Sequence, residues 1–103
     1  MAQFLYILRA VRPEMVSDGP DAREAGILSE HTAYLGQLAD QGTVILAGRT
    51  QVTGPDTMGL VIFEATDEPS ACELMRSDPA VAGGIMSADL YPYAIAVSRN
   101  PDA

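Results

Sequence analysis

The stretch SEHTAYLGQL, residues 29–38, combines a helical pattern of apolar residues with a histidine. It predicts the middle of a long helix and contains His31, the single histidine of the sequence. Apolar residues recur around His31 at the three- and four-residue spacing of one helical face, namely Leu28, Leu35 and Leu38. We therefore expect His31 to point inward with the leucines. A lone histidine on such a face is more often a hydrogen-bonded core residue, whereas a carboxylate neighbour would tune it for acid–base chemistry.

Composition argues against several classes of function. The 103 residues are 48% hydrophobic, which is enough for a modest core, and we expect one domain over residues 1–103. The formal net charge is -8 and the six basic residues are arginines dispersed along the chain. Neither nucleic acid nor an anionic membrane is therefore an expected partner. The sequence has no lysine, which excludes Schiff-base chemistry.

The content of cysteine and histidine argues against a bound metal. Cys72 is the single cysteine, so no intrachain disulfide and no cysteine metal cage can form. With one histidine, a transition-metal site would depend on carboxylates, and we expect no metal and no other cofactor. No basic segment precedes an apolar run at the N-terminus, and no apolar stretch reaches membrane-spanning length. A cytoplasmic protein is the expectation.

The pattern of apolar and turn residues predicts four strands and two main helices. Strands are expected at residues 3–10, 43–49, 58–65 and 85–97, and helices at about 21–41 and from 66 to Asp78, with a helical turn at 79–82. Gly26 leaves open a later helix start near Ser29. Residues 12–20 are expected to form a loop and 99–103 a tail. The order β-α-β-β-α-β is the ferredoxin-like arrangement of an α+β fold with a four-stranded antiparallel sheet.

The strands are apolar on both faces, which is unusual for a sheet covered by helices on one side. In the first strand Leu5 and Ile7 alternate with Phe4, Tyr6 and Leu8. An antiparallel sheet with one face in water would alternate apolar with polar residues. We therefore expect a second subunit to pack sheet against sheet, giving a homodimer of the α/β-barrel kind.

Four segments carry a more specific pattern. They are EHTAYL at residues 30–35, LADQGTVILAG at 38–48, RSDPAVAGG at 76–84 and YPY at 91–93. In this order and spacing they resemble the YCII-related (YciI-like) family, and together they span almost the whole chain. The resemblance implies a dimeric α+β barrel with a small-molecule pocket between the helices and the sheet. It also implies a His–Asp pair at that pocket, formed here by His31 and Asp78.

One branch of that family is linked to removal of chloride from a chlorinated hydroxyhydroquinone, which is an analogy at the level of the family. This sequence has Gly48-Arg49 where many relatives have Gly-Pro, and it has a long loop at residues 12–20. Both departures leave the substrate open.

A His–Asp pair has a clear chemical use. A carboxylate bonded to one ring nitrogen fixes the tautomer and stabilises the imidazolium, which frees the other nitrogen to take or give a proton. Asp78 has an ordinary alternative role, because an aspartate directly before a proline is a suitable helix N-cap. The two roles are compatible, since one carboxylate has two oxygens.

Other residues are weaker candidates for binding a substrate. Arg49 and Arg9 lie on predicted strands, where either could hold an anionic or phenolic group or simply reach water. Tyr34 and Tyr93 could donate hydrogen bonds to a ligand, although tyrosines at such positions usually serve the core or an interface. Glu24 is expected to face solvent.

The sequence is compatible with three functions. The first is a small cofactor-independent enzyme of the lyase, isomerase or dehydrochlorinase-like type, with His31 as general acid/base oriented by Asp78. The second is a non-catalytic ligand-binding or accessory module of the same fold. The third is a heme-free monooxygenase-like protein that oxidises polyphenols with oxygen.

Overall fold

A computed structural model describes residues 1–99 of the chain, so the predicted tail from residue 100 onward lies outside the described residues. The elements in chain order are β1 (Ala2–Ala10), α1 (Glu14–Ser17), α2 (Ala22–Asp40), β2 (Val44–Arg49), β3 (Gly59–Ala65), α3 (Glu68–Ser77), α4 (Pro79–Ala82) and β4 (Met86–Tyr93). In this range no helix is both long and apolar enough to cross a membrane.

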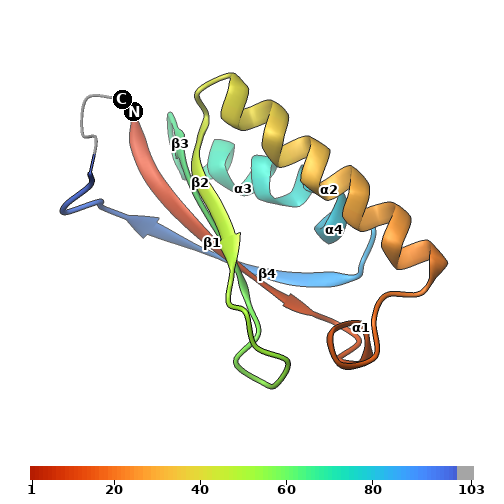
Figure 1. The fold of residues 1–103 in the computed structure, drawn as a ribbon. Coiled ribbons are helices and arrows are strands. Elements are labelled where there is room, and N and C mark those ends of the chain that lie inside the picture. Colours follow the sequence, from red (N-terminus) through yellow and green to blue (C-terminus); the bar gives the residue numbers. More distant parts are fainter. Residues whose placement is uncertain (100–103) are drawn as a thin grey trace.

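The four strands form one antiparallel sheet in the order β2-β3-β1-β4. Helices α2, α3 and α4 all lie on the same side of this twisted sheet, and α1 sits beyond the end of β1 (Figure 1). The ferredoxin-like α+β fold with a four-stranded antiparallel sheet is therefore confirmed. Strand β4 lies at an edge of the sheet, which is where a strand tolerates a proline such as Pro92.

The core lies between the sheet and the helices. Alternate residues of β1 and β3 are buried there, including Tyr6 and Phe63, whose ring centroids are 5.6 Å apart. Leu35 and Leu38 of α2 pack against this cluster, and Leu28 packs against a second, smaller one. The predicted inward face of α2 thus faces the sheet, and His31 shares that face.

Helix α2 begins where its capping signal predicts, so the alternative start near Ser29 is wrong. The Asp21 side chain accepts a hydrogen bond from the Glu24 backbone, and the Glu24 side chain accepts one from the Asp21 backbone. This reciprocal capping box satisfies two backbone donors at the N-terminus. The helix ends before Gly42, whose positive φ of 82° suits a glycine.

Two expectations for the neighbouring loop are corrected by the structure. Residues 12–20 are not wholly a loop, because they contain the single-turn helix α1, whose Met15 is buried against Ala80 and Ile85. Glu24 does not face solvent, because it is only 5% exposed and pairs with the guanidinium of Arg12. Arg12 thereby fastens the start of the loop to the start of α2.

Among residues 1–99, no helix covers the sheet face that points away from α2, α3 and α4. Its half-buried residues in the two central strands include the apolar Leu5, Ile7, Leu60 and Ile62, with the polar pair Gln3 and Glu64 at one end and the exposed Tyr91 and Tyr93 beside them on β4. The last strand ends at Tyr93, earlier than the predicted residue 97.

Candidate functional site

Asp78 lies at the junction between α3 and α4 and is fully buried. Three groups surround its carboxylate, one from the adjacent helical turn and two from distant parts of the chain. The backbone N–H of Ala80 donates to Oδ1 at 3.0 Å, the hydroxyl of Tyr6 donates to Oδ2 at 2.8 Å, and His31 Nδ1 lies 2.6 Å from Oδ1. Donors arranged in this way stabilise negative charge on a carboxylate.

The two roles considered for Asp78 occur together in the structure. Its backbone ends α3 with an extended conformation, as expected for a residue before proline, and its side chain caps α4. The oxygen that accepts from Ala80 is the one that contacts His31. The local cap therefore fixes the orientation of the carboxylate that His31 meets.

Tyr6 joins the site from β1, although the sequence pattern favours a core position for it and does not link it to Asp78. Its hydroxyl reaches Asp78, which is 72 positions away along the chain. Burial, and then the nearby charge of Asp78, raise the pKa of Tyr6 far above its ordinary value, so that the phenol remains neutral and donates. The one available signal is its inward position on a strand, because a buried tyrosine hydroxyl needs a partner.

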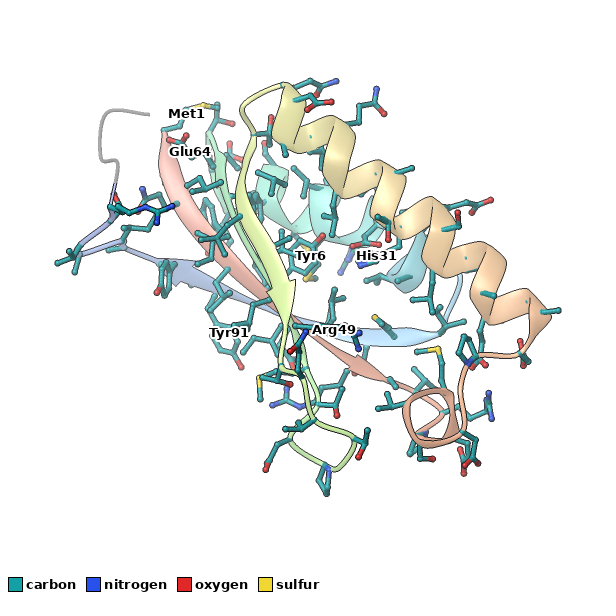
Figure 2. The ribbon with its side chains drawn as sticks, viewed as in Figure 1. Met1, Tyr6, His31, Arg49, Glu64 and Tyr91 are labelled. Atoms are coloured by element: carbon teal, nitrogen blue, oxygen red, sulfur yellow. The ribbon has the colours of Figure 1, made fainter. Side chains whose placement is uncertain are left out.

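His31 completes the chain of contacts from α2. Figure 2 shows its side chain pointing from the helix toward the sheet, beside Tyr6. Because the carboxylate of Asp78 accepts hydrogen bonds, Nδ1 is the ring nitrogen that carries the proton. Within residues 1–99, every buried polar side-chain atom has a hydrogen-bond partner. Nε2 has none in this range, so it cannot be one of the buried atoms. Nε2 is therefore accessible, and the His31 side chain is 15% exposed.

A cavity of about 790 Å³ adjoins His31, between α2, the end of β2 and the loop that joins β2 to β3. Its wall is mainly apolar, with Leu8, Leu35, Val44, Val61 and Met86 among the lining residues. A few polar side chains interrupt that wall: His31, Thr32, Arg49, Thr53 and Thr57. Its size and its mainly apolar character suit a small organic molecule.

Of the other four predicted binding residues, one lines the cavity beside His31 and three do not. Arg49 lines the same cavity as His31. Arg9 lies opposite Ser87 at the far end of β1, and Tyr93 is exposed on the outer sheet face; neither lines this cavity. Tyr34 is half-buried and donates to the Leu74 carbonyl at 2.8 Å, which ties α2 to α3. Burial and the charge of Asp78 raise its pKa.

The described residues offer no evident metal site. Within residues 1–99, no group of three or more His, Cys, Asp or Glu side chains is arranged to hold a metal ion. Cys72, from α3, packs against the core. The ionisable side chains in the cavity wall are the imidazole of His31 and the guanidinium of Arg49.

A family model connects this geometry with known proteins. The model of the YCII-related domain matches residues 4–92, which include all four strands apart from their outermost residues and the whole His31–Asp78 contact. The chain belongs to the YCII-related family. No curated protein matches the sequence.

Solved structures share the fold of this YCII-related chain at low sequence identity. The 5-chloro-2-hydroxyhydroquinone dehydrochlorinase of Burkholderia phenoliruptrix, in complex with 2,5-dihydroxybenzoquinone, has a TM-score of 0.64 and 19% identity, over 88% of this chain and 93% of that one. A conserved protein from Methanosarcina mazei has a TM-score of 0.50 and 17% identity, over 91% and 95%. The cofactor-independent oxygenase SnoaB from Streptomyces nogalater scores 0.47 at 8% identity, over 95% of each chain. At these identities the first two structures show the fold alone.

Proposed function

We propose that this YCII-related protein is a small cofactor-independent enzyme of the lyase, isomerase or dehydrochlorinase-like type, with His31 as general acid/base. The observation that carries the proposal is that the two nitrogens of one imidazole have different surroundings. Nδ1 lies 2.6 Å from the buried Asp78 carboxylate, while Nε2 is free at the wall of an apolar cavity. Such an arrangement prepares one nitrogen for proton transfer.

The proposed reaction follows from that geometry. Nε2 takes a proton from an acidic C–H or O–H of the bound molecule, and the imidazolium that forms is stabilised by Asp78. The electron pair left behind then expels a leaving group from the adjacent carbon, as in a lyase, or the proton returns at another atom, as in an isomerase. General acid–base help of this kind contributes about 10²–10⁴-fold to a rate.

The likeness to the Burkholderia dehydrochlorinase supports a search among hydroxylated aromatic compounds, since that protein shares the fold over most of both chains. Its substrate is not carried over to this chain. A hydroxylated or aromatic metabolite would suit the mainly apolar wall and the few polar side chains of the cavity.

A thermal-shift screen of wild type and His31→Ala, followed by turnover assays, tests this function. The compounds are small phenols, hydroxyquinones, lactones and carboxylic acids, because a ligand that binds the folded state raises the melting temperature. We expect hits that the wild type converts and that His31→Ala does not. Hits that bind both proteins without turnover would favour a non-catalytic module instead. Conversion that consumes oxygen would favour the monooxygenase-like alternative.

We also propose that two copies pack through their outer sheet faces. The support is the apolar outer surface of the two central strands, centred on Leu5 and Ile62. Sedimentation at low micromolar concentration should show a dimer. Ile62→Lys should convert it to a monomer, whereas Gln37→Lys, on the exposed surface of α2, should not. A monomeric wild type would contradict this arrangement.

A further inference from the structure

The charges around the cavity are distributed unlike those of the chain as a whole. The sequence has 14 acidic residues against six basic ones, for a net charge of -8. Within residues 1–99, however, no acidic side chain lines the cavity. The ionisable residues of the wall are Arg49 and His31. A wall without carboxylates in so acidic a protein indicates a ligand that carries negative charge.

The position of Arg49 follows from the register of the sheet. Arg49 is the last residue of β2 and lies opposite Gly59, which in turn lies opposite Leu8 of β1. Residues that are directly opposite in adjacent strands share one face of a sheet. Leu8 is buried beneath the helices, so Arg49 belongs to the face that the helices cover and to the rim of the cavity, not to the outer face.

The guanidinium of Arg49 is available to a ligand. Like Arg9 and Arg76, it makes no ion pair or side-chain hydrogen bond with any residue in the part of the chain that the structure describes, whereas Arg12 pairs with Glu24 and Arg23 donates to the Gly83 carbonyl. Of these unpaired arginines, only Arg49 lines the cavity that adjoins His31. A guanidinium binds a carboxylate through two parallel hydrogen bonds, which gives orientation as well as affinity. An arginine free to act in this way would compensate locally for the repulsion of an anion by the net negative chain.

We propose that the cavity selects small apolar organic anions, with a carboxylate or phenolate-type group held by Arg49 and the reacting atoms directed to His31 Nε2. This inference deepens the proposed function and rests on it for the role of His31. The apolar wall between the two residues takes the hydrocarbon body of the ligand. An uncharged analogue of the same shape keeps that apolar contact but loses the bidentate contact with the guanidinium.

The test compares two ligands of nearly the same shape, one with a carboxylate and one with an uncharged carboxamide in its place. Equilibrium binding of 2-naphthoate and 2-naphthamide is measured by calorimetry at low ionic strength, with wild type, Arg49→Gln and Arg49→Glu. We expect the wild type to prefer the carboxylate by about tenfold, the size expected for one charge-assisted contact that is partly open to solvent. Arg49→Gln should abolish the preference and Arg49→Glu should reverse it.

Arg99→Gln is the matched control, because it removes the same charge from an exposed residue away from the cavity and should keep the preference. Equal binding of the two ligands, binding of neither at millimolar concentration, or a preference that survives Arg49→Gln would overturn the inference.

The same ligands separate this inference from the proposed function. Turnover of uncharged compounds that depends on His31 would overturn anion selection and leave the general acid/base role intact. Conversely, a carboxylate preference that depends on Arg49 would support anion selection even if His31→Gln changed neither binding nor any turnover. The lack of effect of His31→Gln would contradict the proposed catalytic role of His31 and leave anion selection intact.

Discussion

Tyr6 and His31 contact opposite oxygens of one buried carboxylate: the tyrosine hydroxyl donates to Asp78 Oδ2 at 2.8 Å, and the imidazole Nδ1 lies 2.6 Å from Oδ1. They come from β1 and α2, which lie on either side of the core. The carboxylate is therefore held from the sheet and from the helix at once. Such support restricts the imidazole to one orientation, which general acid–base chemistry requires.

Tyr6→Phe should destabilise the protein by about 1–3 kcal/mol, because it leaves a buried carboxylate oxygen without its hydrogen bond. The ring and its packing against Phe63 remain in place. Urea unfolding with a two-state fit measures the change. Ser29→Ala, which removes a hydroxyl from an exposed residue of α2, should change stability by less than about 0.5 kcal/mol. Equal effects of the two substitutions would show that the hydrogen bond from Tyr6 to Asp78 does not contribute to the free energy of unfolding.

Glu24→Gln should make the protein less sensitive to acid. The hydrogen bond from Arg12, followed by that from the Asp21 backbone, lowers the pKa of Glu24 from 4.5 to about 2. Because the folded-state pKa is depressed, the stabilisation is fully present above pH 4.5 and is lost as the pH falls toward 2. The melting temperature of wild type should exceed that of Glu24→Gln at pH 7 and approach it near pH 2. A difference that stays constant over this range would contradict the assignment.

Asp78→Asn should change the tautomer of His31 while keeping the size of the side chain. The carboxylate only accepts, so it selects the N–H form of Nδ1, whereas an amide also offers a donor and removes that selection. The ¹⁵N spectrum of protein labelled in histidine reports the tautomer directly, and His31 is the single histidine of the sequence. Retention of the Nδ1–H form in the variant would mean that Asp78 does not set it. Asp67→Asn, at the N-cap of α3, is the matched control.

Local signals in the sequence account for most of the fold. The run of β-forming residues at 3–10 predicts β1, although not which of its two apolar faces the helices cover, and the capping residue Asp21 predicts where α2 begins. These features depend on neighbours within a few positions, so a single sequence carries them. The start of α4 after Asp78 is predicted for the same reason.

The features that the sequence does not predict depend on contacts between distant segments. The turn α1 forms where Met15 meets a cluster near the other end of the chain, and Glu24 is buried because Arg12 reaches it from the preceding loop. The same holds for the site. The inward face of α2 and the resemblance to the family point to His31 and Asp78, but no local signal shows that Tyr6 reaches the same carboxylate.

The role of Nε2 can be observed by titrating ¹⁵N-histidine-labelled wild type with a ligand from the thermal-shift screen. We expect the Nδ1–H signal to remain that of a proton bonded to Asp78, while the Nε2 signal shifts as the cavity fills. We also expect the shift of Nε2 to saturate with the same affinity as binding. An Nε2 signal that stays unchanged at saturation, or a neutral imidazole protonated on Nε2 instead of Nδ1, would contradict the assignment of this nitrogen as the reactive atom.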